Sequence, residues 1–240
     1  KGYLIGEYQM SLNELPTERA FLYMKEGLSI VSNELGSNDS RAMLLNSILA
    51  GLFFHQGMYD QAEKSYQATL SWVEKTNGAL SERFAWHLVT LSDTKLLTNK
   101  FSEAYKDAGR AQAIYAKLSL KSSYEFASLS YKKGLIALLL NDFNSAKKNF
   151  KVSSRLFGSM PERKKEFVWS EQDLEFATML SDPGTSRDVL QRLVEYLRVL
   201  DGRYSDLLSQ PIRERKVHLE TVLKIKNKAI TVYKEMNTQI

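Results

Sequence analysis

Histidine is the residue of this chain whose chemistry is easiest to compare with known metal and catalytic sites. The three histidines, His55, His87 and His218, are too scattered in the sequence and in helical phase to match the ligand spacing of a metal site. The chain has no cysteine, which excludes disulfides, thiolate ligands and a cysteine nucleophile within it. Phosphate-binding glycine loops, G-x-S-x-G, H-E-x-x-H and Glu-x-x-His pairs are also missing from the sequence. The sequence therefore predicts that the chain is not an enzyme and holds no metal and no cofactor.

Basic side chains are concentrated toward the C-terminal end. Residues 147–165 carry seven basic side chains against one acid, and residues 212–240 carry seven against three, in a chain with a formal net charge of +5. Such a surface could steer acidic proteins, nucleic acid or anionic lipid toward the chain, and the alternative is a set of solvated helix faces. The candidate basic patch consists of Lys147, Lys148, Lys151, Arg155, Arg163, Lys164 and Lys165.

The elements that position these groups follow from a repeat of 42 residues. Four alanines stand at this spacing, each preceded three residues earlier by threonine or an aromatic residue. A column of small residues lies seven positions after the alanines, and a mostly small column lies twelve positions before them. A period between 20 and 50 residues is typical of solenoids, and small residues at fixed positions indicate closely packed helices. The alanines are Ala20, Ala62, Ala104 and Ala146.

Turn-like segments divide each unit into two helices. They are rich in glycine and asparagine, which end one helix before the next begins, as at Gly57, Asn99 and Asn141. Each unit is therefore predicted to be a helical hairpin. The predicted hairpins cover about 1–42, 43–84, 85–126 and 127–160.

Residues 50–69 resemble the consensus of the tetratricopeptide repeat, with a small residue, Gly57, Tyr59, Ala62 and Tyr66 in the expected order. The standard unit has 34 residues, so a spacing of 42 is similar to the longer repeats of the kinesin light chain and MalT-like branch of the family. The resemblance extends to about residue 160 and is weaker at Tyr8 and Ala108. It implies an all-α, right-handed α-α superhelix, a TPR-like solenoid of helical hairpins with C-terminal capping helices.

The repeat degrades beyond residue 160, where Asp188 stands at the position of a fifth alanine. Residues 161–210 are therefore predicted to form a degenerate capping hairpin. Residues 211–240 are predicted to form a last amphipathic helix, because apolar residues recur on one stripe. This helix could pack on the end or the groove of the solenoid, or its seven-residue spacing could form a homodimer or a signal-transmitting coil through 212–240.

In the tetratricopeptide family the first helix of each hairpin lines a concave groove. By this resemblance, the groove of the present chain would be apolar and aromatic, with Trp86 and Tyr131 as anchors. The basic and amide side chains of a carboxylate clamp are missing from these positions, so an amphipathic helix or an apolar peptide fits better than a chain terminus. Alternatively, the two aromatic residues pack between hairpins or under the last helix. The inward positions are Ile5, Gln9, Leu12, Leu44, Ser47, Gly51, Phe54, Trp86, Val89, Asp93, Tyr131 and Leu135.

These observations predict a non-catalytic protein–protein interaction module that binds a peptide or helix of a partner in the groove. The alternative is a ligand- or peptide-sensing regulatory region of a bacterial signalling or transcription-regulatory protein, with its effector domain outside this chain. The 42-residue spacing speaks against nucleic acid as the partner. No apolar run reaches the 18 residues that span a membrane, and the start at Lys1 in mid-pattern indicates a trimmed N-terminus. The localisation stays open between the cytoplasm and a bacterial periplasm.

Overall fold

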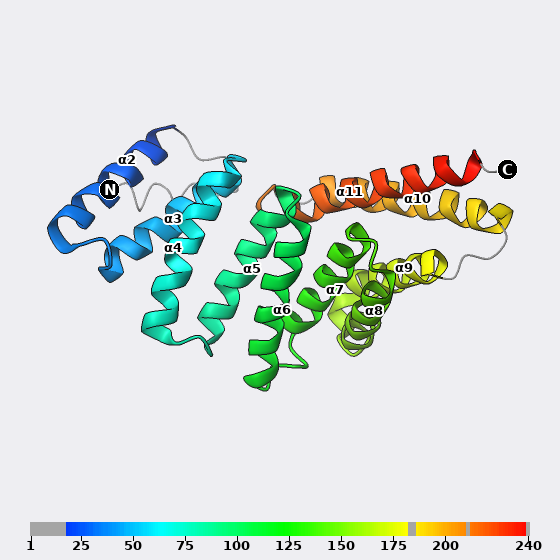
Figure 1. The fold of residues 1–240 in the computed structure, drawn as a ribbon, viewed down its shortest axis with the longest axis horizontal. Helices are drawn as coiled ribbons and strands as arrows, with labels where there is room; N and C mark the ends of the chain where they lie inside the picture. Colours follow the sequence, from blue (N-terminus) through cyan, green and yellow to red (C-terminus); the bar gives the residue numbers. More distant parts are fainter. Residues whose placement is uncertain (1–17, 182–185, 210–211, 239–240) are drawn as a thin grey trace.

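The computed structural model describes residues 18–181, 186–209 and 212–238. In these ranges the chain forms ten α-helices, one 3-10 helix and no strand, which confirms the predicted all-α solenoid. Successive helices pack as hairpins that follow one another along a curved array (Figure 1). The predicted groove residues Ile5, Gln9 and Leu12 lie outside the described residues. The helices are α2 Glu18–Leu35, α3 Ser40–His55, α4 Tyr59–Asn77, α5 Glu82–Leu97, α6 Phe101–Lys117, α7 Tyr124–Leu139, α8 Phe143–Gly158, η1 Pro161–Arg163, α9 Lys164–Ser181, α10 Ser186–Leu208 and α11 Ile212–Asn237.

The same turn closes the hairpins α3–α4, α5–α6 and α7–α8. Gly57, Asn99 and Asn141 stand 42 residues apart, and their φ angles are 80°, 63° and 63°. In each turn the amide of the following residue donates to the carbonyl oxygen five residues earlier, at 2.9 Å. This is the left-handed helix stop that glycine and asparagine favour. The periodic turn residues of the sequence therefore fix the length of the first helix in each hairpin.

The columns of small residues lie where two helices of a hairpin approach closely. Ala62, Ala104 and Ala146 are fully buried. The hydroxyl of Ser92 on α5 donates to the carbonyl oxygen of Ala104 on α6 at 2.8 Å. The ring of Phe150 on α8 lies directly against the backbone of α7 at Gly134. The interpretation of these columns as close helix contacts is confirmed.

The regular pattern changes after α8. The helix α9 packs mainly on α8, as a first helix of a fifth hairpin would, but α10 packs mainly on α11 rather than on α9. In Figure 1, α10 and α11 run side by side along one edge of the array. Residues 161–210 therefore do not form a hairpin of the same kind as the preceding units, and side chains rather than closely spaced backbones connect α9 with α10.

The last helix, α11, also lies across the ends of α5 and α7. Its buried residues Val222, Ile225 and Ala229 belong to the apolar core that contains α7, α9 and α10. The apolar stripe of α11 is thus used within the chain, and a homodimer through this helix stays a prediction. None of the helices in the described ranges has both the length and the apolarity to cross a bilayer.

Candidate functional site

A buried ionic cluster holds α10 against the inward side of α7 and α9. The guanidinium of Arg203 on α10 donates from Nη1 to both carboxylate oxygens of Asp173 on α9, at 3.0 and 2.9 Å. The same carboxylate accepts hydrogen bonds from the hydroxyls of Tyr131 on α7 (2.6 Å) and Tyr196 on α10 (2.7 Å). Asp173 is inaccessible to solvent and Arg203 nearly so. Three helices are therefore joined through one carboxylate.

The protonation states in this cluster follow from its burial. Burial raises the pKa of Tyr131 and Tyr196 well above the usual value, so both hydroxyls remain donors. Burial also disfavours the charged form of Arg203, but the adjacent Asp173 outweighs it and keeps the pKa of the guanidinium above its ordinary value. The cluster is an ion pair with two neutral donors.

The cluster decides which predicted groove residues are accessible. Tyr131 and Leu135 are both buried in the core shared by α7, α9 and α10. The side chain of Tyr131 is engaged with Asp173 and Arg203, so neither residue offers surface to a partner in this structure. The half of the groove at α7 and α9 is occupied by the chain itself.

The rest of the predicted groove lies along α3, α5 and the edge of α7. A pocket of about 380 Å³ lies there. Trp86 is among the residues that line it, with 51% of its surface exposed, and Leu44 on α3 is 45% exposed but does not line the pocket. Val89 is partly buried in the core of the second described hairpin. The pocket is lined by Ser47, Ile48, Gly51, Phe54, His55, Tyr66, Trp86, Thr90, Asp93, Ser128, Lys132, Val217 and His218.

The polar corner of the pocket combines residues from three helices. Asp93 on α5 forms an ion pair with Lys132 on α7, and His218 of α11 lies beside them. Burial lowers the pKa of His218, with a further lowering by the charge of Lys132, while Asp93 opposes the shift. Sequence reasoning placed Asp93 in the groove but missed Lys132 and His218. The 42-residue repeat contains no signal for the path of α11 across the groove.

Comparison with known proteins agrees with this architecture. Residues 40–117, which form α3 to α6, match the family model for the tetratricopeptide repeat. Residues 40–117 are therefore tetratricopeptide repeats (TPRs). Such repeats generally act as protein–protein interaction modules and are typically non-catalytic scaffolds. No curated protein sequence shows a significant match.

Solved TPR structures share the fold at low sequence identity. Two are structures of a putative kinesin light chain with nearly identical TPR-like repeats from Podosopora anserina, one of them a variant with a substitution. They are 14% and 13% identical to this chain, have a TM-score of 0.63, and the alignments cover 84% of this chain and 93% of theirs. A third, BtubC (BKLC) from P. vanneervenii, is 15% identical, with a TM-score of 0.57 and coverage of 99% of this chain and 79% of that one. At these identities the likeness shows the fold alone.

Three of the seven residues of the predicted basic patch form polar side-chain contacts within the described part of the chain, and four do not. Arg163 pairs with Glu166 at 3.3 Å, Lys165 pairs with Asp206 at 3.3 Å, and Lys147 donates to the hydroxyl of Ser181. Within the part of the chain that the structure describes, the remaining four basic residues form no ion pair and are exposed. These residues are Lys148, Lys151, Arg155 and Lys164. The same described ranges contain no group of three or more potential side-chain ligands placed to hold a metal ion.

The burial of His87 on α5 leads us to expect a loss of stability in mild acid. His87 is 3% exposed, and its Nδ1 donates to the carbonyl oxygen of Arg83 at 2.8 Å. Burial lowers the pKa of His87 below its ordinary value, although this hydrogen bond opposes the shift. The unfolded chain therefore binds more protons than the folded chain below about pH 6.5. The free energy of unfolding should fall as the pH drops from about 7.5 to about 5.

Thermal unfolding of the wild type and of a His87→Gln variant, followed by circular dichroism across this pH range, checks the prediction. Glutamine cannot take up a proton, so the stability of the His87→Gln variant should depend less on pH than that of the wild type. Equal slopes for the two proteins would contradict the assignment to His87.

Proposed function

We propose that this chain is a non-catalytic interaction module whose open groove, between α3, α5 and the edge of α7, holds a peptide or helix of a partner protein. The observation that carries the proposal is the half-exposed Trp86 beside a preformed pocket. Tryptophan buries a large area with few rotatable bonds and is enriched among residues that dominate binding energy. Phe54 and Ile48 extend the apolar surface from the neighbouring helix α3.

The occupied half of the groove supports a helix as the occupant. The helix α10 buries Leu193, Leu200 and Leu207, which are spaced seven residues apart, in the core with α7 and α9. This spacing places one apolar stripe of an amphipathic helix against the repeats. A partner helix with a similar stripe would continue along the groove beyond the end of α10.

Replacing Trp86 by glutamate is the direct test. Quantitative mass spectrometry of proteins captured from a lysate of the natural source would compare the wild type with Trp86→Glu. Loss of a central aromatic anchor typically costs about 2 kcal/mol or more, which corresponds to a loss of affinity of about 30-fold. We therefore expect the captured partner to be lost from the variant.

Leu80→Glu is the matched control, because Leu80 is similarly exposed, at 54%, but lies between α4 and α5 and outside the pocket lining. The control should keep the partner. Equal capture by all three proteins, or equal loss from both variants, would count against the groove as the binding site.

The second candidate function is ligand sensing. The observation that favours it is the size of the pocket, which lies in the range of small-molecule sites and combines aromatic with polar groups. Native mass spectrometry of the chain purified from its natural source distinguishes the two candidates. A bound small molecule supports sensing, and a bound protein supports the interaction module.

A further inference from the structure

The helix α11 is a wall of the open groove. Its residues Val217 and His218 line the pocket together with residues of α3, α5 and α7. Val217 also packs on the small apolar cluster of Leu96 and Ile136. An occupant of the pocket would therefore touch α11 as well as the repeats.

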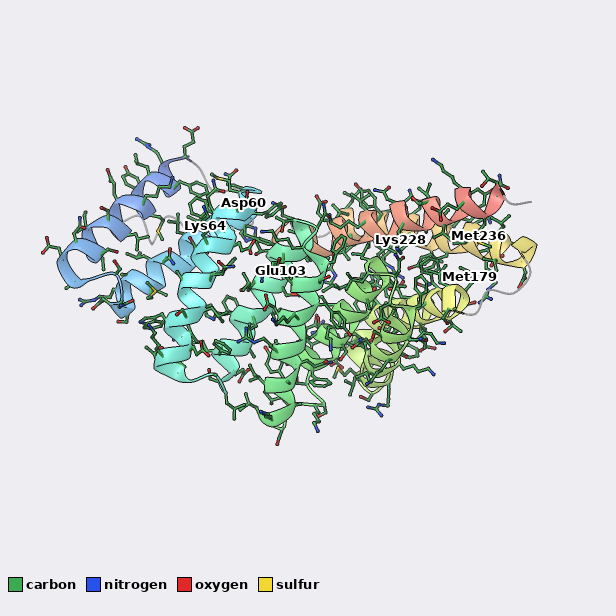
Figure 2. The ribbon with its side chains drawn as sticks, viewed as in Figure 1. Asp60, Lys64, Glu103, Met179, Lys228 and Met236 are labelled. Carbon is green, nitrogen blue, oxygen red and sulfur yellow. The ribbon has the colours of Figure 1, made fainter. Side chains whose placement is uncertain are left out.

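Three lysines attach α11 to the three equivalent turns of the TPR array. Lys216 donates from Nζ to the carbonyl oxygens of Phe54 (3.1 Å) and His55 (2.9 Å) at the end of α3. Lys224 reaches the side-chain oxygen of Asn99, and Lys228 reaches that of Asn141. Lys228 is labelled on α11 in Figure 2. An ammonium group at these positions also interacts favourably with the negative end of each helix dipole.

These attachments differ in strength from those that hold α10. The contacts of Lys224 and Lys228 are exposed to solvent, and single exposed polar contacts contribute little to stability. The first turn of α11 whose side chains the structure describes, residues 216–220, is held by Lys216 and by the partly buried Val217 and Leu219, whereas Thr221, Val222, Ile225 and Ala229 further along are buried. The segment 216–220 is therefore the part of α11 that can leave the repeats at the lowest cost.

We infer that occupation of the groove pocket and docking of residues 216–220 on the repeats are coupled. This inference rests on the proposed function of the groove. An occupant that contacts Val217 and His218 binds the docked state better than the undocked one, and such differential contact is what coupling requires. A partner in the groove thus holds the beginning of α11 in place, and the docked helix in turn tightens the groove around the partner.

Indole is a suitable probe, because it is a neutral aromatic molecule that mimics an anchoring side chain. Titrated into the full chain, it should shift the NMR signals of Trp86 and His218. At about five times its dissociation constant, it should slow hydrogen exchange of the amides of residues 217–220 about sixfold, since the pocket must empty before the segment leaves. Amides of α6, which does not line the pocket, serve as the internal control and should keep their rates.

A pair of variants tests the lysine contacts. Lys216→Met removes the contacts with the carbonyl oxygens of Phe54 and His55 and should speed exchange of residues 217–220 severalfold without indole. Lys226→Met is the matched control, because Lys226 pairs with Asp201 of α10 and not with a turn of the repeats.

Each outcome decides the inference. Shifts at Trp86 with unchanged exchange of residues 217–220 would overturn the coupling and leave the groove intact as a site. An absence of shifts at Trp86 and His218 up to the solubility limit of indole would overturn it as well, since the pocket would then be closed to an aromatic group. The capture experiment with Trp86→Glu tests the proposed function independently of both results.

Discussion

Replacing Arg203 by methionine is expected to lower the free energy of unfolding by about 3–5 kcal/mol. The substitution leaves the carboxylate of Asp173 fully buried without a counter-ion, and the hydroxyls of Tyr131 and Tyr196 cannot supply the missing charge. Removal of one partner of a buried ion pair costs much more stability than replacement of both partners by apolar side chains, because the remaining charge is buried without its hydration. Chemical denaturation followed by circular dichroism measures the loss.

Two further variants identify the cause. Arg198→Met removes an exposed arginine of the same helix and should change the stability by no more than about 0.5 kcal/mol. A double variant, Asp173→Leu with Arg203→Met, removes both charges and should recover part of the lost stability, although the hydroxyls of Tyr131 and Tyr196 then lose their acceptor. Equal unfolding midpoints for Arg203→Met and Arg198→Met would show that the cluster does not hold α10 in place.

The same substitution, glycine to alanine, is expected to have opposite effects at two helical positions. At Gly134 on α7, an added Cβ would lie 2.6 Å from Cδ1 and 2.8 Å from Cζ of Phe150, whose ring is fully buried. Overpacking of this kind typically costs about 1–3 kcal/mol. At Gly109 on α6, an added Cβ would meet no atom within 4 Å, so the gain in helix propensity of about 1 kcal/mol should appear as higher stability.

Thermal unfolding of Gly134→Ala and Gly109→Ala under identical conditions checks this pair. We expect the melting temperature to fall for the first and to rise for the second. An increase for Gly134→Ala would mean that α7 and α8 separate more readily than their packing indicates.

The ionic cluster also has a consequence for binding. Because α10 is fixed by Arg203 over α7 and α9, the part of the predicted groove that is left for a partner lies around α3 and α5. A partner bound there, as we propose, would meet a shorter site than the length of the TPR array suggests. It would also meet α11 at the edge of that site, so the C-terminal helices would define the site together with the repeats.

The sequence by itself determined the repeating part of the fold. The 42-residue spacing of Ala62, Ala104 and Ala146 and of the turn residues Asn99 and Asn141 reflects local requirements, namely close helix packing and a left-handed helix stop. Such requirements arise between helices that are neighbours in the sequence, so the same small and turn-forming residues recur in each repeat. Trp86 and Asp93, which the repeat pattern placed on the first helix of a hairpin, both line the pocket, and their role in binding stays a prediction.

Only the tertiary structure decided which part of the groove is open. Trp86 and Tyr131 were both predicted to be aromatic anchors of the groove, but Tyr131 is buried against Asp173, 42 residues later, and Arg203, 72 residues later. The partnership depends on the packing of α10 over α7 and α9, and no periodic pattern encodes that packing. Contacts between single residues far apart in the sequence cannot be predicted from one sequence, because they depend on how distant helices pack in the folded chain.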